Sequence, residues 1–384
     1  MTEPVLRVED LSITYTVGAG VFQAVSDVSL EMYPGRVIGI VGETGCGKST
    51  LAKAIPRLLP EPPATIGHGK VVFQGTDLVR LTKRQLPMVR GTGIGMIFQE
   101  PLNSLNPAFR VYDQLEEAIR IRHYREMGYV RTFRGGDQPF DYSTRAGAPV
   151  SNPVTKSIVP GGAVADAARD RLRSRSEFRA EVLRYLRLVR INDPEDILDL
   201  YPHELSGGMR QRIMIAMALS EKPAVLIADE PTSALDVTIQ AQVLTLMKEL
   251  IEEVSAAILF ISHDLGVIAE TADEVGVMYA GRIVEYGPVA QVFQDPRHPY
   301  TKALLRAAPN QYKTEGSLRS IAGNVPNLAR PPPGCRFHPR CPLARPVCRG
   351  EAPPLAPVEG VRTEPDARPH ASACYFQSEV PALP

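Results

Sequence analysis

Residues 37–50 read VIGIVGETGCGKST, an apolar run that leads into a glycine-rich loop ending in Lys-Ser-Thr. The loop, residues 42–49, has the spacing G-x-x-x-x-G-K-[ST] and lies between a predicted strand and a predicted helix, as this motif requires. Its glycines let backbone N–H groups turn inward around phosphate oxygens, and the helix N-terminus favours the same negative charge. The stretch therefore predicts a phosphate-binding loop in which Lys48 reaches the β- and γ-phosphates and Ser49 binds Mg²⁺. The predicted nucleotide contacts in this loop are Gly42, Glu43, Thr44, Gly45, Cys46, Gly47, Lys48, Ser49 and Thr50.

Outward from this loop, strand patterns alternate with helical patterns. Several strand runs are uniformly apolar, which indicates a sheet buried on both faces and an α/β fold class. The predicted strands are Leu6–Val8, Leu11–Tyr15, Val25–Leu30, Val37–Val41, Gly69–Phe73, Ile94–Phe98, Ala224–Ala228 and Ala257–Ile261, and the predicted closing hairpin is Val275–Tyr279 with Arg282–Tyr286. The predicted helices are Lys48–Leu59, a segment from about Val111, Ala167–Val189, 209–220, Val237–Val254 and Leu265–Ala272.

The composition limits the classes to which the protein can belong. With 384 residues, 44% hydrophobic and 22% charged, the chain is long enough for one sizeable core and a smaller second unit. Lys plus Arg and Asp plus Glu are equal at 43 each, so no net basic charge attracts nucleic acid, and no nucleic-acid partner is expected. The start, MTEPVLRVED, has no signal-peptide pattern, and the longest apolar runs are far shorter than the roughly 20 residues that cross a bilayer. We therefore expect a soluble, cytoplasmic protein that depends on another chain for any membrane-spanning part.

Two acids follow the apolar run Ala224–Ala228. A strand that lies beside the phosphate-loop strand would deliver Asp229 to Mg²⁺ through water, and Glu230 would then polarise the attacking water as a general base. An apolar strand that simply ends in a turn is the alternative, but the phosphate loop upstream favours the catalytic interpretation.

The segment Leu205–Arg212, LSGGMRQR, opens a predicted helix before that strand. Its two adjacent glycines expose backbone N–H groups, which gives a second anion-binding geometry distinct from the first. One nucleotide site needs only one phosphate loop, so the second element indicates a partner subunit. An isolated Ser-Gly-Gly would be an ordinary helix start.

Together these segments resemble the nucleotide-binding domain of ABC transporters. The resemblance rests on the order of GETGCGKST, MIFQEP with Gln99, LSGGMRQR, LIADEPTSALD and FISHD with His263, and it covers roughly residues 5–310. It implies a P-loop NTPase fold with a mixed sheet core, an antiparallel β subdomain and a helical subdomain at about 100–215. In that family two such domains enclose two ATP molecules, and the LSGG element of one faces the γ-phosphate held by the other.

The resemblance also implies a role for each matching residue. The implied catalytic residues are Glu230, the switch histidine His263 and the loop glutamine Gln99. Gln99 would link Mg²⁺ and water to the transport subunits, so the implied Mg²⁺ ligands are Ser49, Gln99 and Asp229. The implied contacts with the ATP held by the partner are Ser206, Gly207, Gly208, Gln211 and Asp236.

Two further residues of the nucleotide site have a plainer alternative. Tyr15 is the best candidate for stacking on adenine, with Phe22 as its competitor, but a strand aromatic of this kind can also belong to the core. Cys46 occupies a variable position of the phosphate loop, where a small space-filling side chain is the simpler interpretation.

Three features narrow the resemblance to the dipeptide and oligopeptide permease branch of the family. They are MIFQEPLNSLNP, the segment PRHPYTKALLRAAP at 296–309 and the cysteine-rich tail that follows. The branch implies an ATP-binding and ATP-hydrolysing subunit of an importer for short peptides. Import systems for nickel, oligosaccharides or opines share this ATPase branch, so another cargo is an alternative. A soluble ABC-type ATPase switch is a further alternative, which a single cassette without a heptad run does not favour.

The chain divides into an ATPase domain at 1–310 and a Cys-rich extension at 311–384, where hydrophobic periodicity ends and the tail reads as a separate appendage. Within the helical subdomain, residues 128–165 are rich in Gly, Pro, Ser and Thr and have little periodicity. We interpret them as a loop insertion, either a tolerated surface loop or a contact to the permease or a binding protein.

Four of the five cysteines lie in the extension: Cys335, Cys341, Cys348 and Cys374. In a reducing compartment such a cluster suggests a metal more than disulfides, and four thiolates suit either zinc or a [4Fe–4S] cluster. The relatives that the tail resembles are associated with an iron–sulfur cluster on this spacing, so the resemblance implies [4Fe–4S], with zinc or no metal as alternatives. A redox sensor that gates the ATPase is compatible with this interpretation.

Four arginines lie among these thiols: Arg336, Arg340, Arg345 and Arg349. Their charges would offset that of a cluster, and a solvated basic face is an equally good account of them.

The resemblance finally implies partners and a location. Two transmembrane permease subunits would supply the membrane spans, and a second ABC ATPase subunit, usually a distinct chain in relatives, would complete the ATP sites. An extracytoplasmic substrate-binding protein would take part indirectly. The chain would then be a peripheral subunit on the cytoplasmic face of the membrane, with ATP, Mg²⁺ and the [4Fe–4S] cluster as its cofactors.

Overall fold

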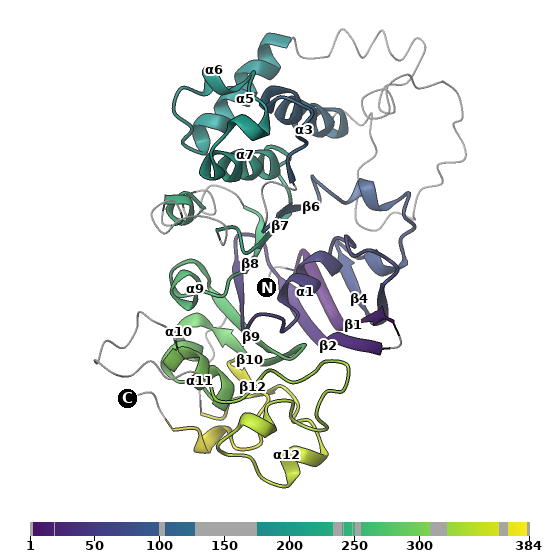
Figure 1. The fold of residues 1–384 in the computed structure, drawn as a ribbon, viewed down its shortest axis with the longest axis vertical. Helices are drawn as coiled ribbons and strands as arrows, with labels where there is room; N and C mark the ends of the chain where they lie inside the picture. Colours follow the sequence, from purple (N-terminus) through teal and green to yellow (C-terminus); the bar gives the residue numbers. More distant parts are fainter. Residues whose placement is uncertain are drawn as a thin grey trace. The chain divides into compact units, whose positions relative to one another are not determined.

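The computed structural model describes residues 3–18, 20–99, 104–126, 175–232, 240, 242–247, 249, 255–307, 321–360 and 368–381. The chain folds into two compact units, of which the first joins Met1–Val79 to Ala257–Pro384 and the second is Arg80–Ala256 (Figure 1). The predicted insertion at 128–165 and the predicted contact Asp236 lie outside the described residues. Among the helices that the structure describes, none is both long enough and apolar enough to cross a bilayer.

The first unit contains an antiparallel sheet in the strand order β2-β1-β4-β5. Its strands are β1 (Leu6–Val17), β2 (Gly20–Met32), β4 (Ala64–Phe73) and β5 (Thr76–Asp77). The two predicted runs Leu6–Val8 and Leu11–Tyr15 are one strand, β1, whose register shifts between Val8 and Leu11. Asp10 lies in this shift with a left-handed φ of 46°, and the bulge lets Val8 and Leu11 both face the core although they are three positions apart.

A second sheet of the same unit positions the phosphate loop. β3 (Val37–Val41) lies between β8 (Ala257–Ile261) and β9 (Glu274–Tyr279) and runs parallel to both. β10 (Arg282–Pro288) pairs antiparallel with β9, which confirms the predicted closing hairpin. All residues of β3 and β8 are buried, and this explains why both sequences are uniformly apolar.

The short helices of the first unit are α1 (Lys48–Ala54), α9 (Leu265–Thr271), α10 (Val289–Gln294), α11 (Pro299–Ala307) and α12 (Val347–Gly350). Of these, α1 packs on β8, α9 on β3, and α10 on β9 and β10. The prediction that α1 continues to Leu59 is wrong, because the helix ends at Ala54. Pro56 has no N–H to donate into the helix, and Arg57 then takes a left-handed φ of 54°. Short 3₁₀ turns lie at Leu78–Arg80, Leu86–Met88, Pro202–Glu204, His338–Arg340 and Gln377–Glu379.

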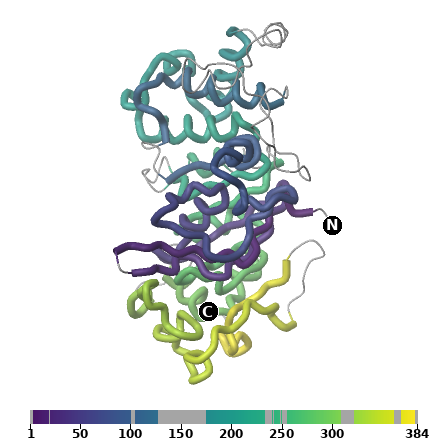
Figure 2. The backbone as a smooth tube through the Cα atoms, turned by 90° about the vertical axis from the view of Figure 1, so that its right-hand side faces the viewer, coloured from purple at the N-terminus to yellow at the C-terminus, as the bar shows by residue number. Residues whose placement is uncertain are grey.

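The C-terminal extension is packed into the first unit. β12 (Ala371–Ser372) pairs antiparallel with β10 and with β11 (Ala356–Pro357), and the N–H of Gln23 donates to the carbonyl of Leu328 over 2.9 Å. Figure 1 and Figure 2 both show the yellow-green C-terminal residues beside the purple first strands. The prediction that the tail is a separate appendage is therefore wrong, because the tail packs against the first unit. The sequence did not reveal this packing, because strands of two residues are too short to show a hydrophobic period. A domain boundary near residue 310 stays a prediction.

The second unit combines a strand pair with a helical bundle. β6 (Ile94–Ile97) runs parallel to β7 (Val225–Asp229), and α3 (Val111–Glu126), α5 (Arg175–Leu188) and α7 (Gly207–Ser220) pack on one another. A short helix, α6 (Pro194–Ile197), packs on α5, and the described residues within 237–254 are helical, as predicted.

Buried Arg122 ties the three long helices of this unit together. From α3 it donates to Glu181 and to the hydroxyl of Tyr185 on α5, and also to the carbonyl of Ser220 at the end of α7. The side chain is only 3% exposed, and pairing with Glu181 offsets the cost of burying its charge.

Candidate nucleotide site

The phosphate loop turns sharply between β3 and α1, and two of its positions require glycine. Gly47, the residue before α1, has a φ of 109°, and a Cβ there would overlap the carbonyl oxygen of Ala24. A Cβ at Gly42 would overlap the carbonyl oxygen of Met278. Any other residue at either position would displace the loop, so the motif glycines are explained by close backbone packing as well as by conformation.

Lys48 lies inside the loop with only 5% of its surface exposed. Its Nζ donates to the carbonyl of Gly42 over 2.9 Å and to that of Glu43 over 3.3 Å. The ammonium group is thus enclosed by the loop that turns around it, and its contact with phosphate oxygens stays a prediction of the motif. Ser49 and Thr50 follow in the first turn of α1 and are half-buried.

Residues far away in the sequence hold the loop from outside. The N–H of Glu43 donates to the hydroxyl of Tyr300 over 2.9 Å, and its carboxylate pairs with both terminal nitrogens of Arg340 at 2.8 and 3.1 Å. The N–H of Gly281 donates to the carbonyl of Cys46 over 2.8 Å. Tyr300 and Arg340 are not among the predicted site residues; the only signals that mark them are their places in PRHPYTK and CRFHPRC.

Cys46 is fully buried within the loop. Burial raises the pKa of its thiol, although the nearby Lys48 ammonium acts in the opposite direction. Burial agrees with the interpretation of this side chain as a small space-filler, and the nucleotide contact of Cys46 stays a prediction.

The parallel pairing of β3 and β8 brings His263 to the edge of the sheet that carries the phosphate loop. The N–H of Ser262 donates to the carbonyl of Ile40 over 3.3 Å, so the residues after both strands emerge side by side. His263 is exposed there, and Asp264 caps α9 by accepting the N–H of Gly266 over 2.8 Å. The predicted switch histidine and the phosphate loop therefore lie at one edge of one sheet.

In the second unit, β6 and β7 bring Gln99 and Glu230 together. The strands are in register at Ile97 and Ala228, and Gln99 Nε2 donates to Glu230 Oε2 over 3.1 Å. Asp229, the last residue of β7, is only 1% exposed. Glu230 has a left-handed φ of 46°, a strained conformation for a residue with a Cβ, and such strain is concentrated at functional sites.

The turn after Glu230 is held by Gln211. This side chain is 1% exposed and donates from Nε2 to the carbonyl of Pro231. The predicted contact of Gln211 with the ATP of a partner stays a prediction, since here the amide supports the turn that carries Glu230.

The LSGG segment begins α7 as the sequence predicts. Ser206 is the N-cap and accepts the N–H of Met209 over 3.3 Å. Ser206 and Gly207 are exposed, and a Cβ added at Gly207 would meet no atom within 4 Å. The start of this helix is therefore exposed, and a side chain at Gly207 would enter open space.

Tyr15 and Phe22 face each other across the β1–β2 ladder, and both are half-buried. Beside them, the strand ends carry Val17, which is 59% exposed, and Val21, which is 52% exposed. Both aromatic candidates are thus partly exposed, and neither is enclosed in the core.

Comparison with known proteins places these features in a family. A family model described as "ABC transporter" matches residues 25–233, and a second, "Oligopeptide/dipeptide transporter, C-terminal region", matches residues 284–348. "Probable peptide ABC transporter ATP-binding protein y4tR" of Sinorhizobium fredii is 43% identical over 376 residues, which are 98% of this chain and 96% of that protein. The chain belongs to the ABC-transporter ATP-binding family.

Two further comparisons agree with this family. "Dipeptide transport ATP-binding protein DppD" of Bacillus subtilis is 40% identical over 98% of this chain and 96% of that protein. A dimeric post-hydrolysis structure of the ATP-binding cassette MJ0796 bound to ADP and Pi has a TM-score of 0.54 and 22% identity, covering 74% of this chain and 98% of that one. The latter likeness shows the fold alone, that of an ABC ATPase cassette. The family match and the relatives make this ABC protein an ATP-binding ATPase subunit.

The extension of this ABC protein gathers its cysteines around one small cavity, lined by Cys335, Cys341, Cys348 and Cys374. All five cysteines of the chain are described, and all are free thiols. Burial raises the pKa of Cys341 to about 11 and that of Cys374 to about 12, so both are protonated at neutral pH. Within the described ranges, no three His, Cys, Asp or Glu side chains are arranged to hold a metal ion.

The arginines between these cysteines do not share one role. Arg336 is buried and donates to the carbonyl of Ala280, to Gln23 over 2.7 Å and to Ser26 over 2.9 Å. For Arg336 and Arg340 the predicted solvated face is therefore wrong, because both turn inward to the ATPase core. Arg345 and Arg349 are exposed.

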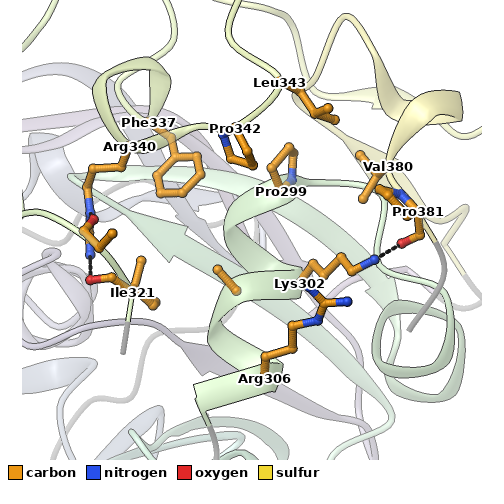
Figure 3. Close-up of a pocket in the computed structure, with 12 residues that line it drawn as sticks. Pro299, Lys302, Arg306, Ile321, Phe337, Arg340, Pro342, Leu343, Val380 and Pro381 are labelled. Carbon is orange, nitrogen blue, oxygen red and sulfur yellow. Dashed lines mark hydrogen bonds between the residues drawn. The ribbon is translucent and has the colours of Figure 1, made fainter. Parts of the chain in front are cut away.

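A cavity of about 350 Å³ lies between α11 and the extension. Its lining is largely apolar, with Phe337, Pro342 and Leu343 on one side, and it includes the basic residues Lys302 and Arg340 (Figure 3). Figure 3 shows Lys302 donating to the carbonyl of Pro381, and Arg340 to that of Ile321.

Proposed function

We propose that this ABC protein is the ATP-hydrolysing subunit that powers the import of di- or oligopeptides through a membrane permease. The cargo assignment is carried by the match of residues 284–348 to the C-terminal region of oligopeptide and dipeptide transporters. The two relatives described above carry peptide or dipeptide transport in their names, and each aligns over 98% of this chain.

The proposed reaction is attack of water on the γ-phosphate of ATP. Lys48 stabilises the charge of the β- and γ-phosphates, while Ser49, Gln99 and Asp229 hold Mg²⁺ or its waters. Glu230 accepts the proton of the attacking water as general base, and His263 senses the γ-phosphate. The hydrogen bond from Gln99 to Glu230 supports this division of labour, because it holds the base in one orientation.

The LSGG segment is proposed to complete the ATP site of a second ATPase subunit. Its exposed helix start offers N–H groups to an anion that the same chain does not bind. Two permease subunits would supply the membrane passage, a binding protein outside would deliver the peptide, and this subunit would lie on the cytoplasmic face of the membrane. Dimer closure on ATP would then drive transport.

Glu230→Gln tests the core of this proposal. The variant should still bind Mg-ATP, while hydrolysis falls by about 10²–10⁴-fold, because an amide cannot accept the proton of water. ATP binding and phosphate release are measured on the same preparation, with Glu270→Gln, an exposed acid on α9, as the matched control. Retained turnover in Glu230→Gln would remove this residue from its role.

The cargo is tested through the partners. The permease and binding protein that co-purify with this chain should bind short peptides and stimulate its ATPase when peptide is present. If nickel or an oligosaccharide stimulates the ATPase activity instead, the proposed ATP hydrolysis stands and the peptide assignment is overturned.

We also propose that the four cysteines of the extension hold a [4Fe–4S] cluster. Four thiols from separate segments line one cavity, which supports the assignment, although no three His, Cys, Asp or Glu side chains of the described residues are arranged to hold a metal ion. When bound, such a cluster would supply a one-electron centre or a cross-link of the extension. Anaerobically purified protein should contain about four iron per chain with broad near-visible absorbance, whereas colourless, zinc-loaded protein would contradict the assignment.

A further inference from the structure

The C-terminal extension reaches the phosphate loop through one side chain. Arg340 pairs with the carboxylate of Glu43 through both of its terminal nitrogens, at 2.8 and 3.1 Å, across 297 positions of sequence. The Arg340 side chain is 4% exposed, and that of Glu43 is 24% exposed. A bidentate, largely buried pair of this kind is directional and much less screened than a surface ion pair.

The guanidinium is itself held firmly. It donates to the carbonyls of Ala322 and Ile321 and contacts the hydroxyl of Tyr279 at 3.3 Å. These acceptors hold the Arg340 side chain beside Glu43. The extension therefore places a fixed positive charge next to the phosphate loop.

Glu43 passes this constraint on to the residue that binds phosphate. Its carbonyl accepts from Lys48 Nζ over 3.3 Å, and its N–H donates to Tyr300 over 2.9 Å. The side chain, N–H and carbonyl of Glu43 are thus all engaged, and a shift of its side chain displaces the backbone against which Lys48 packs.

A second arginine of the extension supports the loop indirectly. Arg336 donates to the carbonyl of Ala280, and the neighbouring Gly281 donates to the carbonyl of Cys46 within the loop. Arg336 directly follows Cys335, and Arg340 directly precedes Cys341. The segment that carries two of the four thiols therefore also supports the phosphate loop.

Charge gives the Arg340–Glu43 pair its function. Glu43 places a carboxylate in the loop that must hold the triphosphate of ATP, and an unpaired carboxylate there would repel the nucleotide. Pairing with Arg340 neutralises that charge and leaves the Glu43 backbone in place for Lys48.

We propose that Arg340 is a positioning residue of the ATP site, through which the cysteine-bearing extension sets the affinity of the phosphate loop for ATP. The proposal rests on the proposed function only in taking ATP as the ligand of the loop. Arg340 contacts Glu43 and not the nucleotide, so its effect falls on ATP binding more than on the chemical step.

The test uses the full-length chain with four changes: Arg340→Gln, Arg340→Lys, Glu43→Gln and the double change Glu43→Gln with Arg340→Gln. The matched control is Arg345→Gln, because Arg345 pairs with Glu379 in the same extension and both side chains are about half exposed. Mg-ATP affinity, KM and kcat are measured for each.

Arg340→Gln should raise the Kd and KM for ATP by about tenfold, the lower end for a lost charge-assisted hydrogen bond, with a smaller change in kcat. Arg340→Lys should lie between this variant and the unchanged chain, since lysine keeps the charge but not the fork. The double variant should bind ATP better than Arg340→Gln alone, because it leaves no unpaired carboxylate, and Arg345→Gln should match the unchanged chain.

Recovery in the double variant separates positioning from simple loss of structure, which a second substitution would not repair. The proposal is overturned if Arg340→Gln keeps ATP affinity within twofold, or if the double variant is as impaired as Arg340→Gln. An unchanged chain that neither binds nor hydrolyses ATP would overturn the proposed function instead.

Discussion

Gly47 shows how one backbone position determines whether the phosphate loop can form. It takes a left-handed φ of 109° immediately before α1, and it packs against the carbonyl of Ala24 on β2. Gly45 in the same loop also has a positive φ, of 80°, but a Cβ there would meet nothing within 4 Å. A side chain at Gly45 would therefore meet only backbone strain, whereas one at Gly47 would meet both backbone strain and a steric clash.

Replacing each glycine with alanine tests this distinction. Gly45→Ala should cost about 1–2 kcal/mol of stability, the strain of a Cβ in the left-handed region. Gly47→Ala should lower the thermal midpoint further and abolish ATP binding, since the loop must also move away from Ala24. Equal thermal midpoints for the two variants would contradict the collision.

Glu221 is a half-buried acid whose ionisation opposes the folding of the second unit. Burial raises its pKa from 4.5 to about 7, although Arg125 and Arg122 act in the opposite direction. Between pH 4.5 and 7 the folded state therefore holds more protons than the unfolded state, and stability falls as pH rises through this window.

Glu221→Gln removes that dependence. The variant should have a higher thermal midpoint than the unchanged chain at pH 8, by an effect on the order of 3 kcal/mol, and the difference should vanish towards pH 4.5. The control is Glu249→Gln, an exposed acid that pairs with Arg190. A constant difference for Glu221→Gln would show that its carboxylate does not titrate in this range.

At the scale of elements, the buried strands were the most predictable part of the chain. Val37–Val41 and Ala257–Ile261 match their predicted bounds because both are short, uniformly apolar and flanked by turn residues. The same patterns led to the phosphate loop, Gln99 and Glu230, which follow strand ends. Local chemistry was thus enough to find the residues that local structure delivers.

The contacts between distant elements could not be predicted. Tyr300 and Arg340 meet Glu43 across 257 and 297 positions of sequence, and no hydrophobic period or motif spacing encodes such a meeting. The end of α1 was missed for a different reason: apolar residues continue beyond Pro56, although the backbone cannot continue as a helix there.

Phe337 packs the extension onto the first unit. It is 1% exposed and forms an aromatic cluster with Tyr279 and Tyr300, at ring distances of 5.1 and 5.4 Å. Tyr300 also holds the phosphate loop, so the cluster joins packing of the extension to the nucleotide site.

Phe337→Ala should destabilise the first unit by about 3–5 kcal/mol, the usual cost of deleting a buried aromatic ring. Phe109→Ala is the control, since that ring is 52% exposed. Thermal unfolding of both variants checks the prediction, and a Phe337→Ala midpoint equal to that of Phe109→Ala would mean that the extension docks without this ring.

At the scale of the whole molecule, the proposed function has the chain carry parts of two ATP sites and complete neither alone. Gly207 is the position at which this can be tested with least damage to the fold, because a side chain there enters open space.

In the Glu230→Gln background, Gly207→Arg should abolish ATP-driven association with the partner ATPase while ATP still binds to each subunit. The arginine would fill the space in which the partner's nucleotide has to lie against the LSGG segment. Gly350→Arg, at another open position, is the control. Sedimentation with and without Mg-ATP measures association, and undiminished association of Gly207→Arg would remove the LSGG segment from the interface.

The cavity beside α11 is a place where a small molecule can bind to the ATPase away from the nucleotide site. The cavity has a volume of about 350 Å³ and a largely apolar lining, which is large enough for a small molecule. Arg340 forms part of its wall (Figure 3). An inhibitor with an apolar body and one acidic group could compete with Glu43 for that guanidinium. Such a compound would lower the affinity of the phosphate loop for ATP without resembling a nucleotide. Resemblance to a nucleotide is the usual obstacle to selectivity among inhibitors of ATPases.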